Sequence, residues 1–269
     1  MAILDGNKLA QENLIEIAKL VVTAALKAPQ ITQSVDIKTE IVTGEDLLPI
    51  IEVMEARGEV SRFIKTDAYT FRRCYEANKP IVLILIGADL TRSELNWNCG
   101  ACGFKTCAEF NAFSKKKQKK GQRQKGPSCQ WKVIDFSIAC DWACASAYQY
   151  GVDNRIQGSS GFAGSALGYL EGCSIILGLP IGPTGNLWWY SKEVPKFTYN
   201  EFQAHMFRTN PTAFLGFTGG GYPEFKYKTR YREGRKWMKV EEDVDLIKRE
   251  EEALKKIEDI VHKKGRKQK

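Results

Sequence analysis

The spacing of hydrophobic residues changes from a helical to a strand period near the start of the chain. Across residues 7–27 apolar side chains recur at helical spacing, which predicts an amphipathic helix. Across residues 35–43 apolar and polar residues alternate and many are β-branched, which predicts a strand with one buried face. After Gly44 a second helix is predicted to run to about Arg57, with Gly58 as its terminator.

The middle of the chain predicts the core of the fold. Residues 81–86 form a continuous apolar run, whose length and branching favour a central strand covered on both faces. Residues 131–150 predict a helix rich in small side chains, which let a neighbouring helix approach closely. A helix over residues 162–170, opened by residues 159–161, and an apolar strand over residues 173–177 follow.

The last part of the chain differs in character. Residues 191–236 are aromatic and rich in loop-forming residues. Residues 241–262 predict a charged helix whose narrow apolar stripe fits docking against the body of the protein or against a second subunit.

Four cysteines between the central strand and the next helix carry the clearest chemistry. Three form a C-x2-C-x4-C turn, and one returns after a basic stretch; they are Cys99, Cys102, Cys107 and Cys129. A [4Fe-4S] cluster needs four soft thiolates that converge on a small volume. Gly100 and Gly103 stand where the backbone would have to wrap such a cluster. Because the motif interrupts the core, we interpret residues 89–130 as an inserted metal lobe.

Zinc and unligated thiols are the alternatives to the cluster. A zinc ribbon usually has two C-x2-C pairs, and the second pair is missing here. The remaining cysteines, which include Cys140 and Cys144 at helical spacing, are interpreted as buried hydrophobic residues because no further tight C-x2-C turn exists.

Composition places these motifs in a reducing compartment. Eight cysteines without a leader sequence favour metal ligation in the cytoplasm over a disulfide framework. No apolar stretch is long enough to span a membrane, so no membrane association is expected. With His205 and His262 as the only histidines, a histidine-dependent triad or metal site is disfavoured, and no general acid or base can be assigned.

The net charge of +8 comes from two basic segments. Lys115–Lys125 carries seven positive charges without an acid, and the last residues from Lys263 carry five more, so the rest of the chain is mildly acidic. The Lys115–Lys125 run is interpreted as a solvated loop beside the cluster or as a docking surface for an acidic redox partner. Nucleic-acid binding is disfavoured because few aromatic residues are interleaved with the lysines.

Residues outside the cysteine motif resemble known flavoproteins. The Ala28-Pro29-Gln30 step and the strand ending in residues 42–47 look like the opening of nitroreductase-like proteins. Residues 151–156, 158–168 and 176–185, together with the cysteine motif, resemble the DUF2148 family of ferredoxin-domain proteins. The resemblance covers roughly residues 7–192.

This resemblance implies an α+β, nitroreductase-like sandwich that forms a homodimer and binds FMN at the subunit interface. It implies a body of residues 1–88 and 131–192, an inserted [4Fe-4S] ferredoxin-like lobe of residues 89–130, and a C-terminal helical extension of residues 193–269. The implied cofactor-binding residues are Gln33, Asn154, Arg155, Gly158, Ser159, Ser160 and Gly161.

The function expected from these features is that of an iron–sulfur flavoprotein oxidoreductase. The cluster would relay single electrons to a flavin that acts on a small substrate. The alternatives are a non-enzymatic ferredoxin-like electron carrier or partner-docking module, and a basic nucleic-acid factor with a structural metal.

Overall fold

A four-stranded antiparallel sheet lies at the centre of the protein. The computed structural model describes residues 3–117, 124–182 and 244–264. The chain forms two compact units, one of residues 1–192 with 250–269 and one of residues 193–249. The described elements are α1 (Gly6–Glu12), α2 (Leu14–Leu26), β1 (Lys38–Thr43), the short 3₁₀ helix Gly44–Asp46, α3 (Leu47–Gly58), α4 (Arg62–Glu76), β2 (Val82–Ala88), α5 (Cys107–Lys117), α6 (Gln130–Gln149), β3 (Asp153–Asn154), α7 (Gly158–Ala166), β4 (Ile175–Gly182) and α12 (Val244–Lys264).

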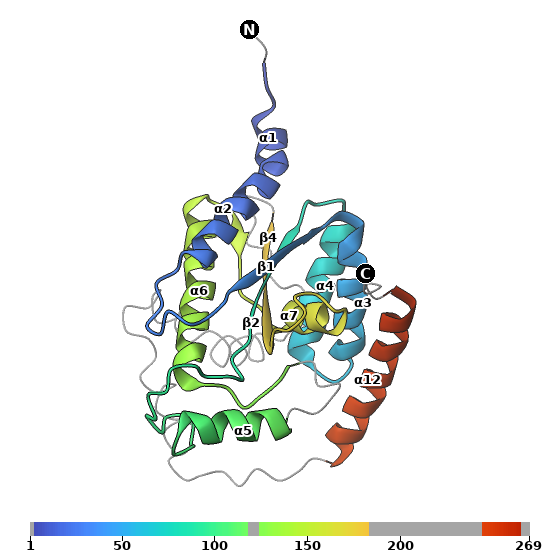
Figure 1. The fold of residues 1–269 in the computed structure, drawn as a ribbon. Coiled ribbons are helices and arrows are strands. Elements are labelled where there is room, and N and C mark those ends of the chain that lie inside the picture. Colours follow the sequence, from blue (N-terminus) through green and yellow to red (C-terminus); the bar gives the residue numbers. More distant parts are fainter. Residues whose placement is uncertain (1–2, 118–123, 183–243, 265–269) are drawn as a thin grey trace, which may run out of the picture. The chain divides into compact units, whose positions relative to one another are not determined.

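The strand β2 is the middle of the sheet, whose order is β1-β2-β4-β3 (Figure 1). Ile84 on β2 lies opposite Ile41 of β1 on one side and opposite Leu179 of β4 on the other. Every residue of β2 is buried. The prediction of a central strand covered on both faces is therefore confirmed.

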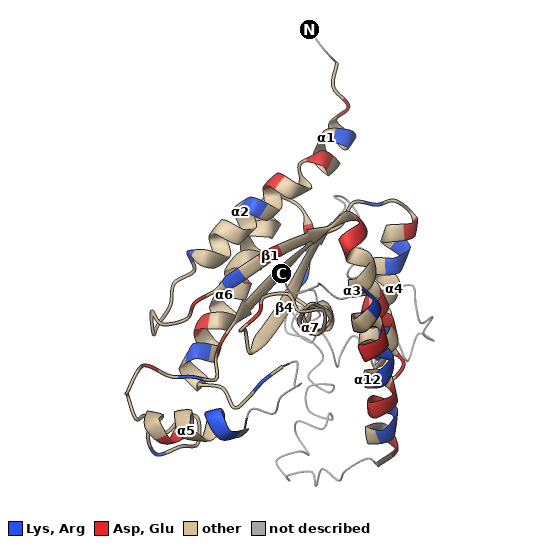
Figure 2. Ribbon diagram, turned by 45° about the vertical axis from the view of Figure 1, so that its right-hand side comes forward, with Lys and Arg blue, Asp and Glu red and all other residues tan. Residues whose placement is uncertain are grey.

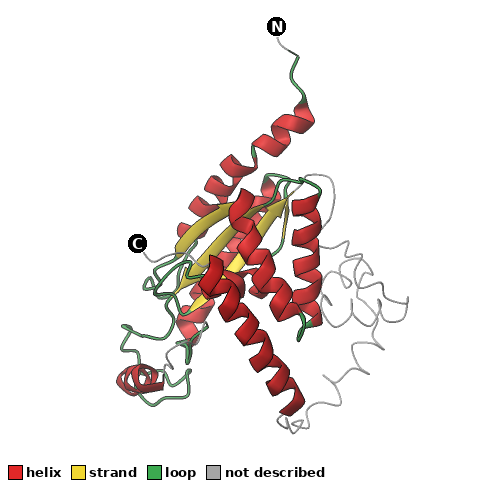
Figure 3. Cartoon of the chain, turned by 90° about the vertical axis from the view of Figure 1, so that its right-hand side faces the viewer, coloured by secondary structure: helices red, strands yellow, loops and turns green. Residues whose placement is uncertain are grey.

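Helices cover both faces of this sheet (Figures 1 and 3). Because successive residues of a strand point to opposite faces, Ile84 and Ile86 join a core beneath α2 and α6. Leu83 and Leu85 join a second core beneath α3, α4 and α7. The mixed α+β class expected from the sequence is confirmed, with the sheet as a middle layer.

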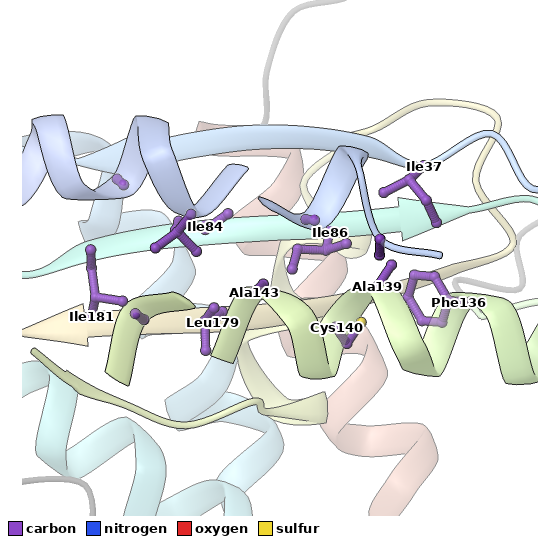
Figure 4. Packing of buried hydrophobic residues seen from close by; sticks show 14 of the residues in the cluster. Ile37, Ile84, Ile86, Phe136, Ala139, Cys140, Ala143, Leu179 and Ile181 are labelled. Atoms are coloured by element: carbon purple, nitrogen blue, oxygen red, sulfur yellow. The ribbon is translucent and has the colours of Figure 1, made fainter. Parts of the chain in front are cut away.

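Small residues let α6 pack closely against the sheet and against α2, as expected from its sequence. Ala139, Ala143 and Ala147 repeat every fourth position and are fully buried. Figure 4 shows Ala139 and Ala143 directed at the sheet beside Ile86, with Phe136 at one end of the row. An alanine at each contact lets the helix lie close, because side-chain bulk sets the distance between packed elements.

The C-terminal part of α12 docks on the body through the predicted apolar stripe. Ile257 is fully buried in the core beneath α3 and α4, and Val261 packs against the same core. Glu250 forms an ion pair with Arg57 at 2.7 Å from carboxylate oxygen to guanidinium nitrogen. Docking against the body is thus the alternative that the structure supports for residues 250–264.

The N-terminal elements are shorter than predicted. The helix predicted over residues 7–27 is two helices, α1 and α2, that meet at Asn13. The strand predicted from Val35 begins at Lys38, because Lys38 pairs with Gly87 and the partner strand β2 ends one residue later.

The strand β4 is longer than the predicted strand over residues 173–177. It runs to Gly182 through Pro180, although proline usually argues against a central strand. The register of β3 places Pro180 opposite Arg155, where the ladder between the two strands is interrupted. The N–H that Pro180 lacks is therefore not needed for a hydrogen bond between β3 and β4. The helix α7 ends at Ala166, before the end predicted for it.

The helix α4 has no counterpart in the sequence analysis. Other predictions fall on residues that the structure does not describe, namely the aromatic segment 191–236 and the loop that follows Gly182. Within the described ranges, no helix combines the length and apolar composition needed to cross a membrane. The predicted domain boundaries remain predictions.

Candidate metal centre

The four predicted cysteine ligands line one pocket between the end of β2 and the start of α6. Cys99, Cys102, Cys107 and Cys129 all contribute to its wall. The lining also includes four aromatic residues, Trp97, Phe104, Phe110 and Trp131, and Ser93 and Leu95 on the approach from β2. The structure thus brings together all four residues that the sequence singled out as metal ligands.

Left-handed backbone positions bend the chain around this pocket. Gly100 and Gly103 have φ angles of 74° and 84°, a region that glycine enters at no steric cost. The N–H of Gly103 donates to the carbonyl of Gly100 at 2.9 Å and closes a turn that contains Cys102. Asn96 and Asn98, just before the first ligand, also have positive φ. Asparagine tolerates this conformation better than most side chains do.

A capping box fixes the start of α5 and with it the third ligand. The hydroxyl of Thr106 accepts from the N–H of Glu109 at 3.1 Å, and the carboxylate of Glu109 accepts from the N–H of Thr106 at 3.3 Å. This reciprocal pair satisfies N–H groups that a helix start leaves without partners. Cys107, the first residue of α5, is therefore held at a defined helix N-terminus.

Hydrogen bonds converge on the Cys107 thiol. The backbone N–H of Asn98 is the main cause that lowers the pKa of this thiol, and burial partly opposes it. The hydroxyl of Ser93 donates to the sulfur at 3.8 Å and acts in the same direction. The side chain of Asn98 in turn accepts from the N–H of Cys107 at 2.9 Å. These contacts favour the thiolate, which is the form that binds metal.

Cys129 connects the pocket to the body of the protein. It is the N-cap residue of α6 and is 6% exposed. Its N–H donates to the carbonyl of Leu90, just after β2, at 2.8 Å, and its carbonyl accepts from the N–H of Val133 at 3.0 Å. The fourth thiol is thus fixed by the segment that follows the central strand and by α6.

The Cys99 side of the pocket is exposed and carries two tryptophans. Cys99 is exposed, in contrast to Cys129. The indole N–H of Trp131 donates to the Cys99 sulfur with 3.3 Å between nitrogen and sulfur. The ring of Trp97 meets that of Trp131 edge-on, with 5.9 Å between centroids and 73° between planes. The pocket therefore has one ligand turned to the body and another at the surface.

A buried lysine holds the segment that enters the lobe. Lys132 on α6 is 4% exposed and donates to the carbonyl of Arg92 at 3.0 Å and to the carboxylate of Glu94 at 3.3 Å. Ser93 exchanges two hydrogen bonds with the side chain of Asn111 on α5, at 2.8 and 2.9 Å. Both sets of contacts tie residues 92–94 to helices that carry ligands.

Comparison with known proteins gives this chain a family. Residues 125–190 match the model of a family described as uncharacterized proteins containing a ferredoxin domain (DUF2148). An uncharacterized protein of Archaeoglobus fulgidus is 33% identical over 174 residues, which span 64% of this chain and 88% of that protein. The chain belongs to the DUF2148 family. The match to the family model includes Cys129, α6 and α7, whereas the other three cysteines precede it.

Solved structures similar to this DUF2148 protein share low sequence identity with it. A BluB-like flavoprotein from Clostridium difficile 630 is 15% identical, with a TM-score of 0.38, and the match covers 75% of this chain and 89% of that one. The NfrA1 nitroreductase from B. subtilis is 13% identical, also with a TM-score of 0.38, and 90% of each chain is covered. These scores describe a loose likeness of fold.

The donor set of this DUF2148 protein fits an iron–sulfur cluster. Four thiols and their N–H and O–H donors surround one pocket, and thiolates are the ligands that such clusters require. Within the described ranges, no three His, Cys, Asp or Glu side chains are grouped as ligands of a single metal ion. The ferredoxin domain in the family description agrees with redox use of the pocket.

The residues implied to bind flavin are spread over two segments. Asn154 lies in β3, Arg155 follows it half-buried, and Gly158 opens α7. Gln33 is exposed, has a φ of 52°, and lies in the loop after α2. The carboxylate of Asp135 on α6 holds this loop by accepting from the N–H groups of Ile31 and Thr32.

The remaining three implied residues take part in packing between α7 and its neighbours. The hydroxyl of Ser159 donates to the carboxylate of Asp67 on α4 at 2.7 Å. The hydroxyl of Ser160 donates to the side chain of Gln157 at 3.1 Å. At Gly161 a Cβ would lie 2.2 Å from the carbonyl oxygen of Ile176, so glycine is needed for helix and strand to touch. Their assignment to flavin stays a prediction.

The basic run begins inside a helix and not in a loop. Lys115–Lys117 form the last turn of α5, with Lys115 and Lys116 exposed, whereas residues 118–123 lie outside the described part of the chain. Figure 2 shows positive charge at this end of α5. A helical C-terminus suits lysine because the helix dipole is negative there.

Sequence reasoning missed the residues that support the ligands. Trp131, Ser93 and Asn98 were not singled out, although Trp131 stands only two positions after Cys129. The capping box of α5 was visible as Thr106-x-x-Glu109. The side-chain donors Ser93 and Trp131 had no comparable signal, because their contacts arise only when residues 92–99 fold against α5 and α6.

Proposed function

We propose that this DUF2148 protein is an iron–sulfur redox protein whose Cys99, Cys102, Cys107 and Cys129 bind a [4Fe-4S] cluster. The observation that carries the proposal is that all four thiols line one pocket, although Cys129 is distant in sequence from the other three. Such a cluster supplies one-electron transfer when bound. The eight free thiols agree with a reducing cytoplasm as its location.

The chain's own residues would hold and orient the cluster. The turns at Gly100 and Gly103 place two ligands, the capped start of α5 places the third, and the N-cap of α6 places the fourth. Donors to the sulfurs of Cys107 and Cys99 stabilise negative charge on the ligand set. Phe110 is fully buried and lines the pocket, so it excludes water from the inner side.

The finer proposal adds FMN, so that the chain is an FMN-dependent iron–sulfur oxidoreductase acting on a small substrate as a homodimer. It rests on two sequence resemblances: residues 28–30 and 42–47 resemble nitroreductase-like flavoproteins, and residues 151–168 resemble the DUF2148 family, whose body is nitroreductase-like. When bound, a flavin converts single electrons into two-electron chemistry. Asn154, Arg155 and Gly158 would contribute from the body, and Gln33 from the loop after α2.

A specific observation favours a second candidate, a ferredoxin-like electron carrier without flavin. The hydroxyls of Ser159 and Ser160 are engaged within the protein, and Gly161 is required for packing. In this case the lobe would serve an acidic redox partner, with Lys115 and Lys116 on α5 as the described part of the docking surface.

Cofactor analysis of the anaerobically purified chain tests both candidates. Iron, acid-labile sulfide, zinc and released flavin are measured per chain. About four iron and four sulfide with one FMN support the oxidoreductase, and iron and sulfide without flavin support the carrier. Zinc in place of iron would refute both. For the enzyme, turnover of a substrate with reduction of the bound flavin is the further requirement.

A further inference from the structure

The indole N–H of Trp131 is the donor at the most exposed cysteine of the pocket. Its nitrogen lies 3.3 Å from the Cys99 sulfur, within hydrogen-bonding range for sulfur. Tryptophan is a donor only, so this contact has a fixed direction. Cys99 is exposed, whereas Trp131 is half-buried at the start of α6. The indole therefore contacts the Cys99 sulfur on the side that faces the protein interior, and not on the side that faces solvent.

The position of the ring is fixed from two directions. Trp131 is the second residue of α6, the helix that Cys129 caps, so one backbone segment places a ligand and a donor to another ligand. Trp97 packs edge-on against the indole at 5.9 Å between centroids, a distance and angle at which aromatic pairs attract. Trp97 itself is 48% exposed. The two tryptophans thus connect α6 to the protein surface beside Cys99.

We infer that Trp131 is a positioning residue that orients the Cys99 sulfur and raises the reduction potential of the cluster. A donor to a cluster sulfur interacts more strongly when the cluster carries an additional electron, because negative charge on the acceptor strengthens the hydrogen bond. Trp131 therefore favours the reduced form. The inference rests on the proposed [4Fe-4S] cluster and names a residue that sets its potential.

The test compares Trp131→Phe with Trp97→Phe. Both keep an aromatic ring, but only the first removes the N–H that donates to Cys99. Each variant and the wild type are loaded anaerobically, checked for iron and sulfide, and titrated by EPR. We expect Trp131→Phe to lower the reduced-to-oxidised ratio at a fixed ambient potential by up to about tenfold, about 59 mV for a one-electron couple. For Trp97→Phe we expect less than a third of that shift.

A measurement on the wild type covers the case in which Trp131→Phe does not load. The chain is labelled with ¹⁵N at the tryptophan indole, and the reduced cluster is examined by pulsed EPR for coupling to one indole nitrogen. Coupling that persists in Trp97→Phe supports the inference. No coupling in the wild type, or a potential unchanged in a loaded Trp131→Phe, overturns it.

The outcomes separate this inference from the proposal beneath it. A wild-type chain without iron and sulfide refutes the cluster, and the assignment of Trp131 falls with it. If the wild-type chain contains iron and sulfide, but Trp131→Phe has the same reduction potential as the wild type, the proposed cluster stands and only the role of Trp131 is refuted.

Discussion

The cysteine lobe and the sheet core of this DUF2148 protein are stabilised by different interactions. In the core, β2 is buried along its whole length between two layers of helices, and apolar contacts dominate. In the lobe, most residues from Glu94 to Gly103 are exposed, and turns, a capping box and donors to sulfur define the geometry. The core is therefore stabilised mainly by buried apolar side chains, whereas in the lobe Phe110 is the one large side chain that is fully buried among the described residues. If the proposed cluster binds, we expect it to supply much of the stability of the lobe.

Removal of one of the four thiols should give the largest difference between the two regions, because the lobe should lose its iron while the body keeps its stability. With Cys102→Ala, iron per chain should fall from about four to background, because a cubane needs four protein thiolates. Thermal unfolding of the body, followed by circular dichroism, should change little. Cys144→Ala is the matched control, since Cys144 lies on α6 away from the pocket and should leave iron unchanged. Equal iron in both variants would contradict the assigned ligands.

Truncation of a buried side chain in the core should have the opposite effect: the body should lose stability while the iron content of the lobe stays the same. Leu85 is fully buried on β2, and Leu85→Ala should lower the free energy of unfolding by about 2–5 kcal/mol, with lost contacts and a cavity as the cause. Iron per folded chain should stay constant. Leu20→Ala, at a side chain 48% exposed on α2, is the control and should change stability by less than about 0.5 kcal/mol. Loss of iron from folded Leu85→Ala would show that the regions are coupled.

Alkaline pH should destabilise the body through its buried thiols. Burial raises the pKa of Cys140 to about 12, from the usual 9.0. Between these values the unfolded chain loses the proton and the folded chain keeps it, so stability is full below about pH 9 and falls toward pH 12. Each such thiol contributes up to about 1.4 kcal/mol per pH unit.

The contribution of Cys140 is measured as a slope of stability against pH. Chemical unfolding of the metal-free chain at several pH values should give a shallower decline for Cys140→Ala than for the wild type. The slope and not the absolute stability is compared, because the substitution also leaves a cavity. Parallel slopes would mean that Cys140 ionises as readily in the folded as in the unfolded state.

The helix cap of the lobe should have a smaller, local effect. Thr106→Ala removes the acceptor for the N–H of Glu109 and should cost about 1 kcal/mol. We expect faster amide exchange in α5 and faster iron loss to a chelator, with exchange in β2 unchanged. Thr106→Ser keeps the oxygen and should resemble the wild type. Faster exchange in β2 as well would show that the cap supports the body.

Charge at the end of α5 should have the smallest effect. Positive charge near the cluster favours its reduced form, so Lys115→Gln with Lys116→Gln should lower the reduction potential slightly at low salt. The shift should shrink as salt is added, because the screening length is about 10 Å at 0.1 M. Lys8→Gln on α1 is the control for a general charge effect. A potential that does not respond at low salt would exclude a role for these lysines in tuning it.

The sequence was informative where the signal is local. Residue type and spacing predicted that the four thiols lie together, and they do line one pocket; the two glycines between them take left-handed conformations. The central strand was identified because residues 81–86 are apolar without interruption, and the short length and β-branching of this run favour a strand buried on both faces.

Elements whose inner face is polar could not be predicted in the same way. The helix α4 was missed because Thr66, Asp67 and Thr70 are buried on it, so the apolar period is interrupted. Asp67 is nevertheless paired there with Ser159, which lies 92 positions later in the chain. The full length of β4 was missed because the effect of Pro180 depends on which neighbouring strand its N–H would have faced.

The separation in sequence between contacting residues has a consequence for synthesis on the ribosome. Arg57 on α3 pairs with Glu250 on α12 across 193 positions, so this side of the core is completed only when the C-terminus has emerged. The contact between Trp131 and Cys99 spans only 32 positions. All four thiols are therefore outside the ribosome, together with the donor to Cys99, while much of the chain is still to be made. Binding of the proposed cluster would therefore not have to wait for the C-terminal part of α12 to pack on the body.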